Sequence, residues 1–282
     1  MYKNYKGVLY MKFTLSAFAD EASKQINEQI IAMKENGITH LEIRGVDGEN
    51  ISKISCEKAK EVRKQLDDAG LAVWSLGSPY GKIKITDSFE EHLDLFKHGL
   101  EIADILGTKN IRMFSFFISD GEYEKHSEEV MKRLEKFIDA AKGTGILLCH
   151  ENEKGIYGDI ASRCLEIHKN FPAFRGVFDP ANYVQCHQDT IEAWEMLAPY
   201  IEYMHIKDAL PDGLVVPPGK GVGNLKYLLE NYKGKVLSIE PHLTKFVGFD
   251  ALEGGEKTQL GFSYPNNRAA FDAAVAALKE LI

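Results

Sequence analysis

The chain has 282 residues, of which 44% are hydrophobic and 27% are charged, and its formal net charge is −8. This is an ordinary soluble composition with enough chain for a sizeable core. No apolar run approaches the roughly 20 residues of a membrane span, and the acidic balance disfavours binding to nucleic acid or anionic lipid. We therefore expect no nucleic-acid partner and no membrane contact.

Cysteine usage and the first residues bear on the cellular compartment. The four cysteines show no CxxC spacing, and the first ten residues contain no apolar stretch of signal-peptide length. From these observations we expect reduced thiols and a cytoplasmic location. No Pro-, Gly- or Ser-rich linker and no low-complexity segment divides the chain, so we expect one domain over residues 1–282.

Strand patterns alternate with helical patterns along the whole chain, with eight of each. The first strand is expected at 13–18, and Asp20 is a plausible N-cap of a helix that ends near Gly37. Strict alternation implies a parallel sheet, and eight units favour its closure into a single (β/α)8 TIM barrel. The other strands are expected at 40–44, 71–76, 110–114, 146–150, 174–178, 201–204 and 236–239, and the other helices at roughly 55–69, 88–106, 123–142, 158–170, 189–198, 223–232 and 267–281.

Each of the last four strand patterns stops at a residue that can bind a metal. These residues are Glu151, Asp179, His205 and Glu240, at spacings of 26 to 35 residues. A strand, a helix and their loops need about 30 residues, and the carboxyl ends of barrel strands meet at one mouth. Three carboxylates and one imidazole there suit a divalent cation. Two alternatives stay open: a strand-end acid often caps the next helix, and a lone histidine is often a core residue.

A resemblance to the xylose isomerase-like barrel superfamily is carried by His150-Glu151, Phe178-Asp179-Pro180, His205-Ile206-Lys207-Asp208 and Ile239-Glu240-Pro241. That group includes sugar isomerases, ketose 3-epimerases, hydroxypyruvate isomerases, inosose dehydratases and endonuclease IV. The resemblance implies that Glu151, Asp179, His205 and Glu240 hold one Mn²⁺, Mg²⁺, Zn²⁺ or Co²⁺ ion. It also implies that Glu151 and Glu240 are the catalytic acid/base pair.

Glu151 and Glu240 suit this double role on physical grounds. One oxygen of each carboxylate could bind the cation while the other lies near the substrate, and the cation would lower the pKa of both groups. The cation would also polarise a substrate carbonyl and stabilise an enediolate. We therefore expect a divalent-metal-dependent isomerase or epimerase that acts on a sugar, keto-sugar or related polyol.

Five further residues are candidate substrate-binding groups. Lys207 lies two residues after His205 and faces the same side of the strand, and the resemblance suggests that it binds a substrate oxygen. A salt bridge between Lys207 and Asp208 is the alternative. Asn182 stands where many relatives have His. The remaining candidates are Trp74, His242 and Glu42, and for Glu42 a simple ion pair with Arg44 is the alternative.

Two long loops leave the predicted mouth, at 208–224 and 241–267, and are candidate substrate walls or lids. The first contains Lys220 between two glycines, where it could hold an anionic group. It is not a Walker A motif, because no Gly-Lys-Ser or Gly-Lys-Thr occurs there.

Three alternatives to an isomerase stay open: an inosose dehydratase-like lyase, an endonuclease IV-like DNA repair enzyme and a non-catalytic sugar-binding barrel. Asn182 in place of a His and the acidic balance oppose DNA repair. The sequence leaves open the substrate, the identity of the metal, and whether the chain forms a homo-oligomer.

Overall fold

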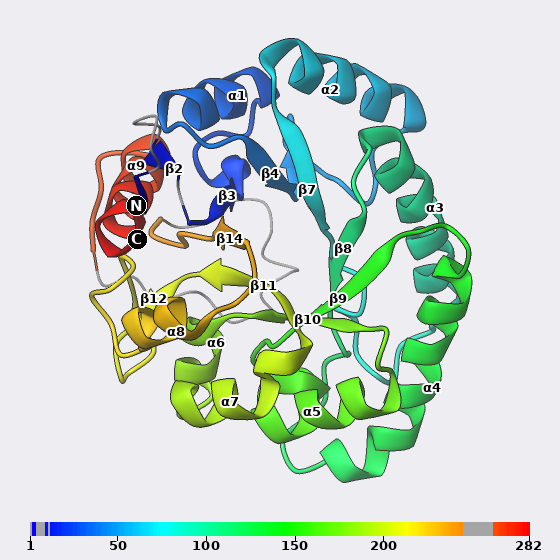
Figure 1. The fold of residues 1–282 in the computed structure, drawn as a ribbon. Coiled ribbons are helices and arrows are strands. Elements are labelled where there is room, and N and C mark those ends of the chain that lie inside the picture. The colour runs from blue at the N-terminus through cyan, green and yellow to red at the C-terminus, as the bar shows by residue number, and fades with distance from the viewer. Residues whose placement is uncertain (1, 4–8, 11, 245–261) are drawn as a thin grey trace.

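The computed structural model describes residues 2–3, 9–10, 12–244 and 262–282. Eight parallel strands close into a barrel in chain order, and helices surround it (Figure 1). The prediction of a (β/α)8 TIM barrel is confirmed. The barrel strands are β3 (Thr14–Ala17), β4 (His40–Ile43), β7 (Ala72–Gly77), β8 (Asn110–Met113), β9 (Leu147–Glu151), β10 (Arg175–Phe178), β11 (Ile201–Ile206) and β14 (Val236–Ile239).

Nine α-helices lie among the described residues, one more than the sequence patterns predict. The additional helix is α6, which begins at Pro180 directly after Asp179. Its six residues are too few to show a helical hydrophobic period, so the sequence suggests only a tight turn there. The helices are α1 (Ile26–Glu35), α2 (Cys56–Ala69), α3 (Glu90–Leu106), α4 (Tyr123–Ala141), α5 (Ala161–Asn170), α6 (Pro180–Gln185), α7 (Thr190–Leu197), α8 (Leu225–Asn231) and α9 (Asn267–Leu281).

The first predicted helix begins later than the sequence suggests. Asp20 lies in a short 3-10 helix, η1 (Ala19–Glu21), and α1 begins only at Ile26. The Asp20 carboxylate accepts hydrogen bonds from the Arg44 guanidinium at 2.9 and 3.2 Å. The prediction of an N-cap at Asp20 is wrong, because a buried charge-assisted pair takes up the oxygens that would cap a helix.

The barrel interior has an apolar layer beneath a polar one. Tyr203 packs there with Cys149, Val177 and Val236 in a cluster separate from the main core. Side chains two residues apart on a strand point to the same side, so the next inward positions on these strands lie one step nearer the carboxyl ends. Those next positions are the polar residues His205, Glu151, Asp179 and Ser238. The polar site therefore rests on an apolar floor.

The first of the two long predicted loops is built around one carboxylate. Asp208 accepts hydrogen bonds, each at 2.9 Å, from the backbone N–H groups of Ala209, Gly219, Gly221 and Gly223. A Cβ at Gly221 would collide with the Ala209 carbonyl oxygen, so only glycine permits this approach. The backbone donors beside Lys220 thus bind a side chain of the protein itself, which does not support the anion-binding hypothesis for that lysine.

Three small antiparallel pairs accompany the barrel. One lies in the loop just described, and residues 245–261 of the second long loop lie outside the described residues, so its role as a lid stays a prediction. The pairs are β12 (Asp208–Ala209) with β13 (Val215–Val216), β5 (Gly45–Val46) with β6 (Glu49–Asn50), and β1 (Tyr2–Lys3) with β2 (Leu9–Tyr10).

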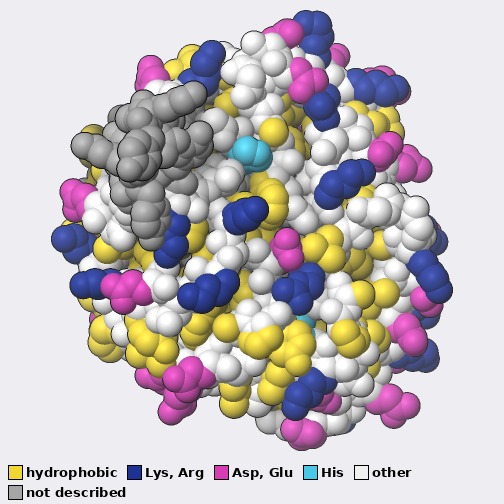
Figure 2. All heavy atoms as spheres, viewed as in Figure 1, with side chains coloured by type: hydrophobic (Ala, Val, Ile, Leu, Met, Phe, Trp, Pro, Cys, Tyr) yellow, Lys and Arg dark blue, Asp and Glu magenta, His cyan; other side chains and the backbone are white. Residues whose placement is uncertain are grey.

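The surface seen in Figure 2 carries basic and acidic side chains interspersed, with hydrophobic side chains in small groups between them. Opposite charges are therefore mixed on this face of the molecule. Among the helices in the described part of the chain, none combines the length and the apolar character needed to cross a membrane.

Candidate metal centre

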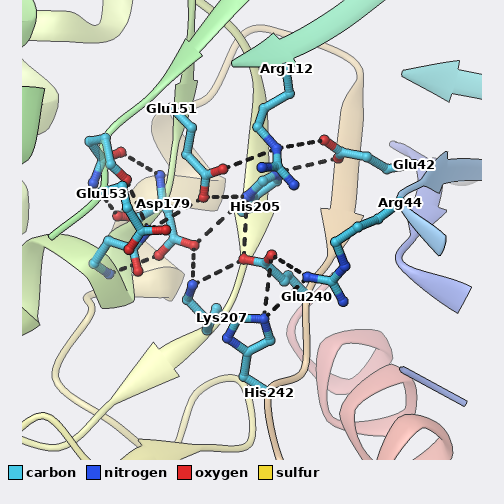
Figure 3. A network of polar contacts seen from close by, with 12 residues as sticks. Glu42, Arg44, Arg112, Glu151, Glu153, Asp179, His205, Lys207, Glu240 and His242 are labelled. Atoms are coloured by element: carbon cyan, nitrogen blue, oxygen red, sulfur yellow. Dashed lines mark hydrogen bonds and ion pairs between the residues drawn. The ribbon is translucent and has the colours of Figure 1, made fainter. Parts of the chain in front are cut away.

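The four predicted metal ligands converge at the carboxyl ends of their strands. Glu151 ends β9, Asp179 and Glu240 directly follow β10 and β14, and His205 lies in β11. All four are buried, and each offers one ligand atom within 4.8 Å of those of the others. Figure 3 shows the four side chains pointing toward one another. The structure thus brings together the whole predicted quartet.

The geometry around His205 Nδ1 fits a single divalent ion. This nitrogen lies 3.0 Å from Glu151 Oε1, 3.8 Å from Asp179 Oδ2 and 3.6 Å from Glu240 Oε2. Adjacent ligands of one ion, with bonds of about 2.0–2.2 Å, are about 3–3.6 Å apart. The residues present therefore fit Mn²⁺, Mg²⁺ or Zn²⁺.

The protonation of His205 is linked to the positive charge of that ion. Burial alone would lower the pKa of the imidazole, but the neighbouring carboxylates of Glu151 and Glu42 raise it well above its ordinary value. A protonated His205 places one positive charge among the carboxylates. A cation at the same place requires the imidazole to lose that proton, so we expect metal binding to release a proton.

Glu42 supports His205 from the side away from the other ligands. Glu42 Oε2 lies 3.0 Å from His205 Nε2, and the Tyr203 hydroxyl donates a hydrogen bond of 2.7 Å to Oε1. A carboxylate that accepts the Nε2–H directs the Nδ1 lone pair toward the quartet. Glu42 is fully buried among these partners, and its contact with substrate stays a prediction. It is a positioning residue.

Three cations hold the carboxylates of the quartet. Arg112 Nε lies 3.2 Å from Glu151 Oε2, and Arg44 Nη1 lies 3.2 Å from Glu240 Oε1. Lys207 Nζ lies 3.0 Å from Glu240 Oε2 and 2.9 Å from Asp179 Oδ2. Each carboxylate is therefore oriented by a buried ion pair as well as by its position at the end of its strand.

Glu151 and Glu240 differ in proton affinity. Burial raises the pKa of the Glu151 carboxyl. Burial acts the same way on Glu240, but the Lys207 ammonium beside it brings its pKa well below the ordinary value. Such a difference suits two carboxyls that take opposite parts in proton transfer.

Sequence reasoning overlooked Arg112, and it named Arg44 only as an alternative ion-pair partner of Glu42. Arg44 pairs with Asp20, Glu21 and Glu240. The signal for Arg112 is present in the sequence, because it is a charged residue within the buried strand β8. A buried guanidinium requires acidic partners, and the predicted strand-end carboxylates are the nearest source of them.

Asp179 divides its two oxygens between two tasks. Oδ1 accepts a hydrogen bond of 2.9 Å from the Asn182 N–H and so caps α6, while Oδ2 faces His205 and Lys207. The capping alternative and a ligand role are therefore compatible. Asn182 Nδ2 donates hydrogen bonds of 2.9 Å to the Asn152 carbonyl and 3.3 Å to Glu151 Oε1. Its contact with substrate stays a prediction.

The three remaining candidates have different positions. Lys207 contacts two quartet members, and the alternative pair with Asp208 is wrong, since Asp208 accepts backbone hydrogen bonds instead. His242 Nε2 lies 3.5 Å from Glu240 Oε1 with 22% of its side chain exposed, so a substrate contact there stays a prediction. Trp74 packs edge-on against Tyr203 at 5.8 Å, in the apolar layer below the quartet. Its ring packs on the barrel floor, and its contact with substrate stays a prediction.

Residues 30–242 match a family model described as a xylose isomerase-like TIM barrel. The chain belongs to this family. Similar solved structures include the probable 3-DHS dehydratase AsbF from Bacillus anthracis, with 16% identity, a TM-score of 0.72, and coverage of 95% of this chain and 99% of that one. Another is the 3-keto-D-glucoside 4-epimerase YcjR from E. coli, with 18% identity, a TM-score of 0.68, and coverage of 96% and 99%.

A third similar structure is the IOLI protein, described with a bound zinc atom. It has 16% identity, a TM-score of 0.69, and coverage of 94% of this chain and 97% of that one. At these identities the likeness concerns the fold. A comparison with curated protein sequences found no significant match.

Proposed function

We propose that this member of the xylose isomerase-like family is an enzyme, a divalent-metal-dependent isomerase or epimerase of a sugar, keto-sugar or related polyol. The observation that carries the proposal is the convergence of three carboxylate oxygens on His205 Nδ1 at the carboxyl ends of β9, β10, β11 and β14. The names of two structures with the same fold, the 4-epimerase above and an L-ribulose 3-epimerase, support sugar chemistry, and a third is described in complex with magnesium.

The quartet would hold the ion, and neighbouring side chains would orient the quartet residues. Glu42 keeps the Nδ1 lone pair of His205 directed at the ion site through the bond to Nε2. Arg112 holds one oxygen of Glu151, and Arg44 holds one oxygen of Glu240. When bound, a divalent cation supplies the charge that polarises a substrate carbonyl and acidifies the adjacent C–H bond.

Glu151 and Glu240 then exchange a proton with that carbon. They lie at the carboxyl ends of the first and last strands of the quartet series, and each has a carboxylate oxygen within 3.6 Å of His205 Nδ1. We propose that one removes the proton and the other returns it. Removal from one face and return to the other inverts a centre, whereas return to the neighbouring carbon interconverts aldose and ketose.

The test is a substrate screen in heavy water. The protein is stripped of metal, reloaded with Mn²⁺, Mg²⁺ or Zn²⁺, and incubated with a panel of aldoses, ketoses and keto-polyols. We expect deuterium at the carbon beside the carbonyl of one substrate, and Glu151→Gln and Glu240→Gln should each lower the rate by about 10²-fold or more. Glu166→Gln is the control, because Glu166 accepts a hydrogen bond from the Tyr157 hydroxyl and belongs to no ligand cluster of the described residues. Unlabelled product together with near-normal rates in both quartet variants would contradict the proposal.

A lyase is the second candidate, and Lys207 favours it. Its ammonium is buried and lies within 3.0 Å of both Asp179 and Glu240, where it could donate a proton to a leaving hydroxyl. One structure with the same fold is described as a probable dehydratase. Mass spectrometry separates the two candidates, because a dehydratase product is lighter than its substrate by one water.

The remaining proposals come from the sequence. We propose a small-molecule substrate, no nucleic-acid partner, a cytoplasmic location and one domain over residues 1–282. A non-catalytic sugar-binding barrel would bind the ion and the sugar without exchanging deuterium, so the same screen distinguishes it.

A further inference from the structure

Three metal-binding side chains meet on α2 and α3, away from the quartet. Cys56 comes from α2, and His98 and Glu101 come from α3. Their ligand atoms all lie within 4.8 Å of one another. The Cys56 thiol donates a hydrogen bond to Glu101 Oε2 at 3.8 Å, and His98 Nδ1 lies 4.0 Å from the same oxygen. None of the three belongs to the proposed metal centre of the barrel.

Two packed helices hold these side chains in place. Cys56 is the first residue of α2, whose start is fixed by the Ser55 side chain accepting a hydrogen bond of 3.1 Å from the Lys58 N–H. His98 and Glu101 are three residues apart on α3 and so occupy one face of that helix. The sulfur, nitrogen and oxygen donors therefore converge from two regular elements.

The His98 ring is held in the tautomer that a metal ligand requires. Nε2 lies 2.8 Å from the Ile54 carbonyl oxygen. A carbonyl oxygen only accepts, so Nε2 carries the hydrogen and Nδ1 carries a lone pair, and Nδ1 lies 4.0 Å from Glu101 Oε2. Metal-binding histidines commonly donate their second ring N–H to a carbonyl or carboxylate in this way.

We propose that Cys56, His98 and Glu101 form a second metal site, selective for Zn²⁺ and with its fourth position open to water. A thiolate and an imidazole favour Zn²⁺ over Mg²⁺ or Mn²⁺, and thiolate and carboxylate together balance two positive charges. Ligands of a tetrahedral zinc ion are about 3.3–3.6 Å apart, so the two distances to Glu101 Oε2, 3.8 and 4.0 Å, require a small closure, and the Cys56–His98 pair lies within 4.8 Å. The Glu101 side chain, 70% exposed, is free to make it.

The thiolate provides a spectroscopic test on the full-length protein. Co²⁺ replaces Zn²⁺ in tetrahedral sites, and a cobalt–thiolate bond gives a charge-transfer band in the near ultraviolet that carboxylate and imidazole ligands do not give. The barrel quartet contains no thiolate, so Co²⁺ bound there does not produce this band. We expect the wild-type protein to develop the band on Co²⁺ titration and to lose it when Zn²⁺ is added.

Three variants decide whether the band comes from this site. Cys56→Ser should abolish the band and lower the zinc stoichiometry by one ion per chain, while His98→Ala should weaken Co²⁺ binding at the band by about 10-fold or more. Cys186→Ser is the matched control, because Cys186 is also partly exposed but lies in none of the ligand clusters of the described residues. No band in the wild-type protein, an unchanged band in Cys56→Ser, or equal affinity in His98→Ala would overturn the proposal.

Discussion

Replacement of Glu42 by Gln tests whether a residue outside the quartet controls the proposed metal centre. In the wild-type chain the Glu42 carboxylate accepts from His205 Nε2 at 3.0 Å and from the Tyr203 hydroxyl at 2.7 Å. Glutamine keeps the size but removes the charge and offers only one acceptor oxygen. One of the two donors then lacks its partner, and the tautomer of His205 is no longer held.

The expected loss is in metal affinity. Partners of this kind change metal affinity by about 10- to 100-fold, which corresponds to about 1.4–2.8 kcal/mol. Folding should suffer less, because Arg112, which lies 3.6 Å from Glu42 Oε1, keeps its closer partner Glu151 at 3.2 Å. We expect a loss of unfolding free energy of about 1–3 kcal/mol, the range for one unsatisfied buried group.

Calorimetric titration with Mn²⁺ measures the affinity, and urea unfolding monitored by circular dichroism measures the stability. Glu166→Gln is the matched control, since Glu166 accepts a hydrogen bond from the Tyr157 hydroxyl as Glu42 does from Tyr203, but belongs to no ligand cluster of the described residues. It should leave Mn²⁺ affinity unchanged. An affinity in Glu42→Gln within twofold of wild type would refute the positioning role.

Three further predictions concern the ion, acid stability and the loop after β11. His205→Ala should lower metal content and activity together, and full metal occupancy in that variant, measured by atomic emission, would show that His205 is not a ligand. Burial lowers the pKa of His92 to about 4, and its Nε2 accepts a hydrogen bond of 2.7 Å from the Gly81 N–H. An unfolded histidine titrates near 6.5, so stability present above about pH 6.5 should be lost as pH falls toward 4, by up to about 3 kcal/mol. In urea unfolding, His92→Gln should flatten this loss, and an identical pH profile would contradict the assignment. Asp208→Asn should lower the unfolding free energy by about 2–3 kcal/mol, because an amide NH₂ would face backbone donors such as the Gly221 N–H; a loss below about 0.5 kcal/mol would contradict that account.

The sequence by itself determined the barrel and the identity of the quartet. Each βα unit is a local pattern, an apolar run followed by a polar residue and a helical period, and eight such units leave few architectures open. Strand alternation also predicted that His205 and Lys207 face the same side of the strand. These features depend on residues that are close together along the chain, so the sequence alone predicts them.

The tertiary structure decided which side chains meet across the barrel. Glu42 and His205 are separated by 163 residues, and Arg44 and Glu240 by 196. Whether Glu42 points to the ring of His205 or to a substrate depends on strand tilt, the bulge between β4 and β7, and the partners already taken by Arg44. Closure of the barrel sets these distances, and no local sequence pattern encodes them. The positions and partners of Glu42, Asp20 and Trp74 could therefore be read only from the tertiary structure.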